Sequence, residues 1–163
     1  MKQMDPLIRL VKDHENISEF LEDVGEMDFL HDEEAWKKIK PIEEFFQRHI
    51  IHHFEFEEKN VFPAILLKLA TLESIKLILE LQREHGVILT KLWEFLSITS
   101  KKIAPVDKET SAELNSMGRK IIHLLLIHAS KEDDKLLPIL EKNREIFDFK
   151  ENLHKDYVRV TSQ

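Results

Sequence analysis

A short pattern that occurs twice constrains the fold of this chain more than any other feature. Each copy places a glutamate four residues after a histidine, and a hydrophobic residue followed by proline comes shortly afterwards. The copies run from His53 to Ile65 and from His128 to Leu140, so matched residues are 75 positions apart. Because residues four apart share one face of an α-helix, each histidine and its glutamate can reach the same metal ion. The pattern therefore predicts helices, each kinked or ended by the proline just beyond the pair.

A further histidine precedes each copy of the pattern. His14 comes 39 residues before His53, and His85 comes 43 residues before His128. Both lie in stretches where apolar residues recur at steps of three and four, as on the buried face of a helix. The chain thus divides into two halves, each a pair of helices that carries two histidines and a glutamate. Four such helices side by side predict a symmetric site for two metal ions.

This order of residues, with its hydrophobic-proline sequel, resembles the hemerythrin-like (HHE) cation-binding domain family. The resemblance covers roughly residues 5 to 142. It implies an all-α fold, an antiparallel up-down-up-down four-helix bundle around a non-haem di-iron centre. The ligands that it implies are His14 and His53 on one iron, His85 and His128 on the other, and Glu57 and Glu132 as bridges.

The chain departs from the oxygen carriers of that family at two positions. The carriers place a second histidine four residues after the one on their third helix, where this chain has Leu89. Their acidic ligand on the fourth helix is an aspartate five residues after the histidine, whereas Glu132 follows His128 by four. Both differences count against simple reversible oxygen carriage.

Composition sets the outer limits of the interpretation. A chain of 163 residues fits one domain, and only 3 Gly and 5 Pro favour helices. The absence of cysteine excludes disulfides and thiolate ligands. The net charge of −7 counts against nucleic acid or an anionic membrane as a partner. No signal peptide or apolar run of transmembrane length is apparent, so we expect a cytoplasmic protein.

Apolar periodicity places the helices at about 5–25, 33–59, 71–99 and 107–133, with short extra helices after Pro63 and Pro138. Thr71 and Asp107 are suitable N-caps for the third and fourth helices. The third helix is expected to bury Ile75. We assign residues 1–146 to the bundle and residues 147–163 to a C-terminal tail.

The remaining histidines carry weaker signals. His49 shares the predicted inner face of the second helix with His53 and is a candidate extra ligand or hydrogen-bond donor. His52 and His123 fall on outer faces, and His31 falls in a charged connection, so these three are expected to be solvated. The only Glu-x-x-His sequence lies in the tail, which excludes the ferritin-like pattern of two such pairs inside a bundle.

Two classes of function are compatible with such a centre. The first is a metal-binding module that binds or senses O₂ or NO, or stores iron. The second is an oxidase- or peroxidase-like enzyme that acts on peroxide or O₂. Imidazole and carboxylate ligands suit iron but also manganese or zinc, and a metal-free bundle with hydrogen-bonded core residues is the remaining alternative. Apart from His49, no acid or base outside the ligand set stands out, which favours binding; a protein partner stays open.

Overall fold

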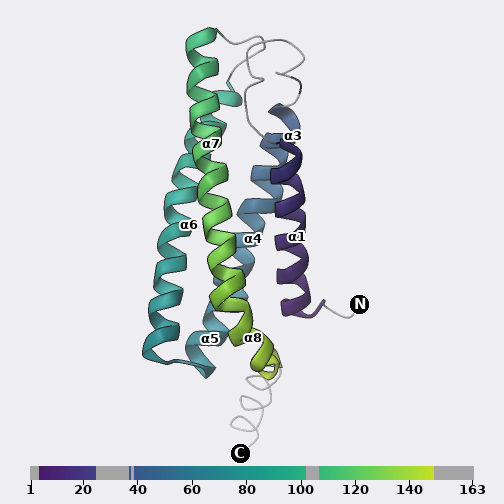
Figure 1. Ribbon diagram of the computed structural model, residues 1–163, viewed down its shortest axis with the longest axis vertical. Coiled ribbons are helices and arrows are strands. Elements are labelled where there is room, and N and C mark those ends of the chain that lie inside the picture. Colours follow the sequence, from purple (N-terminus) through teal and green to yellow (C-terminus); the bar gives the residue numbers. More distant parts are fainter. Residues whose placement is uncertain (1–3, 25–36, 38, 102–106, 149–163) are drawn as a thin grey trace, which may run out of the picture.

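The computed structural model describes residues 4–24, 37, 39–101 and 107–148, which form long helices lying side by side (Figure 1). The first is α1 (Pro6–Val24), and the third is α6 (Leu72–Thr99). The second consists in order of α3 (Ile39–Glu44), η1 (Phe45–Ile50), α4 (Ile51–Phe56), η2 (Glu57–Val61) and α5 (Phe62–Lys68). The fourth consists of α7 (Lys108–Lys131), η3 (Glu132–Leu136) and α8 (Leu137–Lys142), followed by the 3₁₀ turn η4 (Arg144–Asp148). The predicted all-α four-helix bundle is confirmed.

Side-chain caps begin the third and fourth helices, as predicted. The hydroxyl of Thr71 accepts a hydrogen bond from the backbone N–H of Ser74, whose hydroxyl accepts one from the N–H of Thr71. The carboxylate of Asp107 accepts a bond of 2.7 Å from the N–H of Thr110. Each cap satisfies a backbone donor that the first helical turn leaves free, and is worth about 1 kcal/mol.

The two prolines do not end their helices but are preceded by π-helical turns. Segments η2 and η3 begin at Glu57 and Glu132, and the N–H groups of Phe62 and Leu137 bond the carbonyls of those glutamates five residues back. Proline has no N–H and its ring crowds the carbonyl four residues earlier, so a wider turn before it lets the helix continue. Both glutamates thus stand at the start of a π-helical turn, a feature often found at functional sites.

Two apolar clusters fill the bundle, one above and one below a polar layer in the view of Figure 1. On α1, Leu10 belongs to the lower cluster and Ile17 to the upper one, and His14 lies between them. On α6, Leu81 and Ile88 flank the polar layer in the same way. Packed apolar side chains on both sides therefore hold the polar layer at a fixed height in the bundle.

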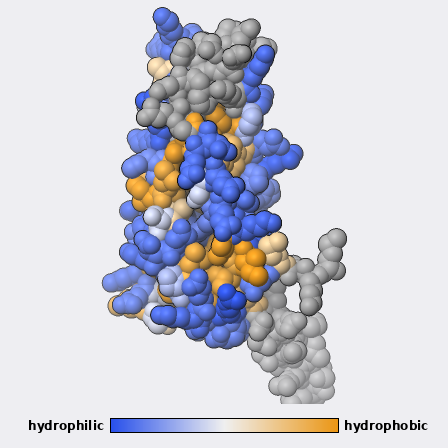
Figure 2. Space-filling model, turned by 45° about the vertical axis from the view of Figure 1, so that its right-hand side comes forward, coloured by the Kyte–Doolittle hydropathy of each residue, from blue (hydrophilic) through white to orange (hydrophobic). Residues whose placement is uncertain are grey.

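The surface follows the charge of the sequence. The face in Figure 2 is mostly hydrophilic, with separate apolar areas in its upper and lower halves. Contrary to the prediction, Ile75 is exposed, because the buried face at this end of α6 runs through Ser74, Leu77 and Ile78. Within the described part of the chain, no helix is long and apolar enough to cross a membrane.

Some predictions fall on parts of the chain that the structure does not describe. These are the connection at 26–32 with His31, the predicted start of the second helix at 33–36, and most of the tail at 147–163. The division into a bundle and a tail stays a prediction. Of the tail, Phe147 lies in η4 and packs, partly buried, against the lower cluster.

Candidate metal centre

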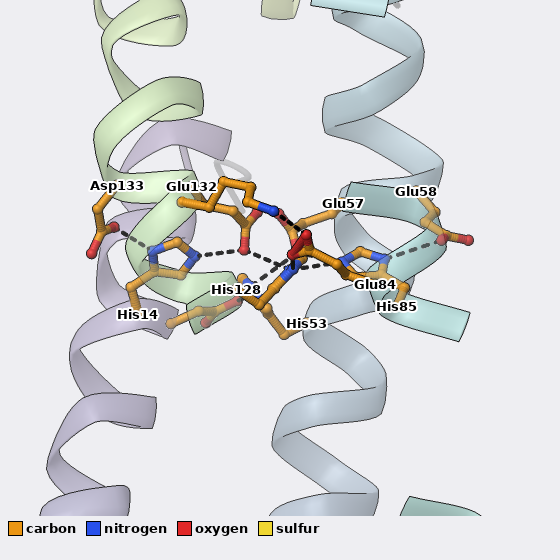
Figure 3. A network of polar contacts seen from close by, with 11 residues as sticks. His14, His53, Glu57, Glu58, Glu84, His85, His128, Glu132 and Asp133 are labelled. Atoms are coloured by element: carbon orange, nitrogen blue, oxygen red, sulfur yellow. Dashed lines mark hydrogen bonds and ion pairs between the residues drawn. The ribbon is translucent and has the colours of Figure 1, made fainter. Parts of the chain in front are cut away.

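All six predicted ligand residues meet in the polar layer (Figure 3). Each helix of the bundle contributes, and no side chain among the six belongs to a residue more than 6% exposed. They come from α1 (His14), α4 (His53), η2 (Glu57), α6 (His85), α7 (His128) and η3 (Glu132). The structure therefore brings together the complete set, although ligation itself stays a prediction.

Each glutamate lies between one histidine from each half of the sequence. Glu57 Oε1 is 3.1 Å from His53 Nε2 and 3.4 Å from His85 Nε2. On the other side of the layer, Glu132 Oε1 is 2.9 Å from the Nε2 atom of His128 and 3.5 Å from that of His14. This placement is the one that bridging carboxylates require.

The ligand atoms form two overlapping groups. One group is His14, His53, Glu57 and Glu132, and the other is Glu57, His85 and His128. Within each group, one nitrogen or oxygen per residue lies within 4.8 Å of all the others. Glu57 belongs to both groups, so the two candidate ion positions share a ligand.

The outer nitrogen of every one of these imidazoles faces a carboxylate. The four contacts join the Nδ1 atoms to carboxylate oxygens as follows: His14 to Asp133 at 2.7 Å, His53 to Asp13 at 3.1 Å, His85 to Glu58 at 3.0 Å, and His128 to Glu84 at 3.0 Å. We call these four acidic residues the outer carboxylates. Each comes from the helix that precedes its histidine in the chain, and the fourth helix serves the first. The contacts therefore close a ring around the bundle.

The ring of outer carboxylates favours one tautomer of the four histidines, with the hydrogen on Nδ1. When Nδ1–H donates to a carboxylate, Nε2 is left with a lone pair that points into the centre, as a metal ligand needs. Basic side chains accompany two of the four carboxylates: Lys131 contacts Glu84, and Arg9 lies 4.0 Å from Asp13. The ring thus orients the imidazoles and makes them stronger donors to a cation.

Two of the inner nitrogens face each other directly. The Nε2 atoms of His85 and His128 are 3.0 Å apart. With both Nδ1 hydrogens held by carboxylates, both Nε2 atoms present lone pairs, which repel unless a proton or a cation lies between them. Burial first, and then the nearby His128, lower the pKa of His85 to about 3, so a proton is disfavoured there. A shared metal ion fits this pair.

Several buried polar atoms in the layer lack a hydrogen-bond partner among the described residues. They are both carboxylate oxygens of Glu57, both of Glu132, and Nε2 of His14. The imidazole contacts of these oxygens are short, but they are not directed as hydrogen bonds. Unpaired buried carboxylates are costly in an apolar interior. These unsatisfied atoms all belong to residues of the two candidate ligand groups, so the residues present fit a metal centre.

The two glutamates differ in protonation when no cation is bound. Burial, followed by the charge of Glu132, raises the pKa of Glu57 well above its ordinary value. Burial also acts to raise the pKa of Glu132, but its contacts with Glu57 and two histidines outweigh burial and hold that pKa well below the usual range. The pair therefore holds one proton, which two cations would displace.

Sequence reasoning missed the four outer carboxylates. Each is the direct neighbour in sequence of a predicted ligand, as in Asp13-His14 and Glu84-His85. Adjacent residues on a helix point about 100° apart, so one reaches into the centre while the other reaches the neighbouring helix. The sequence signal that could have identified the outer carboxylates is an acidic residue directly beside each of four predicted ligands.

His49, a candidate extra ligand, lies outside the centre. Its side chain is exposed and stacks on Phe45, with the ring centroids 5.3 Å apart. It lies in η1, where the wider π-helical turn rotates the residues out of the four-residue spacing that placed it on the face of His53. His52 and His123 are exposed, as predicted.

Comparison with known proteins agrees with this arrangement. The sequence model of the family described as "Hemerythrin HHE cation binding domain" matches residues 5–140. Neither the curated proteins nor the solved structures compared with the chain gave a match. The family match spans most of the chain and contains all six residues that meet in the polar layer. The chain therefore belongs to the hemerythrin HHE cation-binding domain family.

Proposed function

We propose that this protein holds two metal ions in the polar layer, with iron as the native metal. The observation that carries the proposal is the sharing of Glu57 between two groups of potential ligands. His14 and His53 would hold one ion, His85 and His128 the other, and Glu57 and Glu132 would lie between them. The unsatisfied oxygens of the buried glutamates support this assignment.

The role that we propose is binding or sensing of O₂ or NO, or storage of iron. Imidazole and carboxylate ligands also accept manganese or zinc, and iron is preferred on the resemblance to hemerythrin-like proteins. Bound iron would supply redox chemistry and coordination positions for small ligands. The part of this chain is to supply neutral imidazoles, to supply two carboxylates, and to exclude bulk water with the apolar clusters on either side.

An oxidase- or peroxidase-like enzyme acting on peroxide or O₂ is the second candidate. Such an enzyme needs an acid or base near the reacting atoms. His49 was the candidate for that role, and it lies exposed on η1 rather than in the polar layer. This placement favours binding over catalysis. Leu89, at the position where oxygen carriers have a histidine, favours sensing or storage over simple carriage.

Metal analysis tests the proposed stoichiometry. Protein purified without added metal and then reconstituted anaerobically with ferrous iron should contain two ions per chain, because each of the two ligand groups offers at least three ligand atoms. Elemental analysis measures the ratio, and anomalous scattering from a crystal locates the ions. A ratio of one, or no retained metal, would contradict the two-ion centre. Iron recovered without supplementation would support iron as the native metal.

The outer carboxylates should matter for affinity although they are not expected to touch metal. Replacing Asp133 with alanine removes the acceptor for His14 Nδ1 and leaves that ring free to turn. We expect a loss of about 10- to 100-fold in affinity for one of the two ions, measured by competition with a chelator. Asp134→Ala alters the exposed neighbour on the same turn and should leave both affinities unchanged. Equal losses in the two variants would show that general surface charge, not the ring, is responsible.

A further inference from the structure

A groove on the surface leads to one of the predicted ligands. It has a volume of about 360 Å³ and lies where α1 runs beside η3 and the start of α8. Residues from α1 line one side, the exposed Asp133 and the partly buried Leu137 line the other, and His14 is reached from the groove. The groove therefore comes to the edge of the polar layer from the outside of the bundle.

The opposite edge of the polar layer is covered by aromatic rings. His85, which corresponds to His14 in the second half of the repeat, is 1% exposed. The ring of Phe54 stacks on it with centroids 3.9 Å apart, and Phe62 lies stacked at 5.5 Å. Two buried apolar rings thus pack directly against this histidine.

The internal repeat explains why the two edges differ. The residues 75 positions after Phe54 and Phe62 are the smaller Ala129 and Leu137, and Leu137 lines the groove together with His14. Ser18 lines the groove four residues after His14, whereas the equivalent position after His85 is Leu89, which packs against the upper cluster. Among the described residues, only His53 brings an aromatic ring close to that of His14. Each position that closes the His85 edge has a smaller or more polar counterpart at the His14 edge.

We propose that small ligands reach the centre from the His14 edge only, through this groove. The ion held by His14 and His53 is then the one that an incoming molecule meets first. This inference rests on the proposed metal-binding function and adds the side from which small ligands enter the centre. Three carboxylates, those of Glu15, Glu19 and Asp133, line the groove. Their charge favours neutral molecules such as O₂, NO and hydrogen peroxide over anions.

The test narrows the groove and compares the result with a matched change on the other side. Val11→Trp places a large side chain in the groove, and Gln82→Trp places one at the equivalent position of α6. The probe is azide, mixed in a stopped-flow spectrometer with each iron-loaded ferric protein at one ionic strength. Val11→Trp should slow azide association by about tenfold, which corresponds to about 1.4 kcal/mol in the barrier. Gln82→Trp should leave the rate unchanged.

A second variant copies the closed edge onto the open one. Leu137→Phe introduces the residue found at Phe62 in the other half, and together with Ser18→Leu it should slow azide association as Val11→Trp does. Helical content and metal content, measured for every variant, separate a closed groove from a damaged fold. Azide rates that are unchanged in both groove variants, or that fall as much in Gln82→Trp, would overturn the proposal.

A labelling experiment on metal-free protein separates this inference from the metal-binding proposal. Diethyl pyrocarbonate modifies accessible imidazoles in their unprotonated form, so the rates are measured with rising pH until they reach a plateau, and peptide mass spectrometry assigns the modified histidines. His14 should be modified faster than His85, and Val11→Trp should remove the difference. If the protein holds no metal but His14 reacts selectively, the proposed function fails and the groove stands. If two metals bind but His85 reacts as fast as His14, the groove proposal fails and the metal centre stands.

Discussion

Replacing Glu57 with glutamine should stabilise the metal-free protein and, at the same time, remove most of the stabilisation that metal ions provide. In the metal-free state, burial and the nearby Glu132 raise the pKa of Glu57 well above its ordinary value. Glutamine has nearly the same shape but no proton to gain or lose. Removing the buried carboxyl group that must take up a proton on folding should increase the free energy of unfolding by about 1 to 3 kcal/mol at pH 7.

The sign of this effect depends on pH in a defined way. A carboxyl with a raised pKa takes up a proton on folding, so its contribution is fully favourable below its ordinary pKa and is lost as the pH rises toward the folded value. Glu57→Gln should therefore gain stability over the wild type near neutral pH. The gain should disappear below about pH 4.5, where the unfolded wild-type chain is protonated as well.

When metal is bound, the wild type should have a higher free energy of unfolding than Glu57→Gln. A ligand that binds only the folded state at 1,000 times its Kd adds about 4 kcal/mol to stability. Glu57 belongs to both ligand groups, so the glutamine variant lacks an anionic ligand at both ions and should keep little of that gain. Urea unfolding with and without ferrous or zinc ions measures both effects. Glu55→Gln, an exposed change two residues away, should behave as the wild type in both conditions. A glutamine variant that is less stable than the wild type without metal would contradict this account of the buried pair.

The parts of the fold that sequence could predict depend on local, regular geometry. Residues four apart share a helical face, so His53 with Glu57 and His128 with Glu132 could be paired without any coordinates. The cap at Thr71 is equally local, because its partner is three residues away. Long stretches of apolar periodicity predicted the positions of the four helices. Each of these inferences needs only the 3.6-residue repeat of an α-helix.

One of the errors comes from a departure from that repeat. In η1 the helix widens to a π-helical turn, and one turn of this kind is enough to rotate His49 out of the centre. The error at Ile75 is of another kind, because α6 is a regular α-helix from Leu72 onward and its buried face begins with Ser74, Leu77 and Ile78. The outer carboxylates were missed for another reason, since each contact joins different helices and depends on how those helices are rotated about their axes. Helical periodicity within one segment carries no information about that rotation.

Acid should destabilise the metal-free protein through His85, and this is the second large effect that we expect. Burial and the adjacent His128 lower the pKa of His85 to about 3, compared with 6.5 for an exposed histidine. Below pH 6.5, His85 therefore binds a proton in the unfolded chain but not in the folded protein. The free energy of unfolding falls as the pH drops from 6.5 toward 3. The loss should reach about 2 kcal/mol at pH 5 and about 4 kcal/mol near pH 3.

His14, which corresponds to His85 in the first half of the repeat, has the opposite effect on stability as the pH falls. Although burial works to lower the pKa of His14, its contact with Glu132 outweighs burial, and the pKa is raised above 6.5. A raised histidine pKa gives stability that is present below pH 6.5 and is lost as the pH rises through the folded value. The wild-type profile is therefore a sum of opposing contributions, and only a comparison of variants isolates the part due to His85.

His85→Leu provides that comparison, because leucine fills the buried position without titrating and leaves His14 in place. Between pH 7 and pH 5, the free energy of unfolding of metal-free His85→Leu should fall by about 2 kcal/mol less than that of the wild type. Urea titrations followed by circular dichroism at each pH give both profiles, and His52→Leu, a change at an exposed position, should follow the wild type. Parallel profiles for the wild type and His85→Leu would mean that His85 gains its proton in the folded protein, so that the space between its Nε2 and that of His128 accepts a proton as readily as a metal ion.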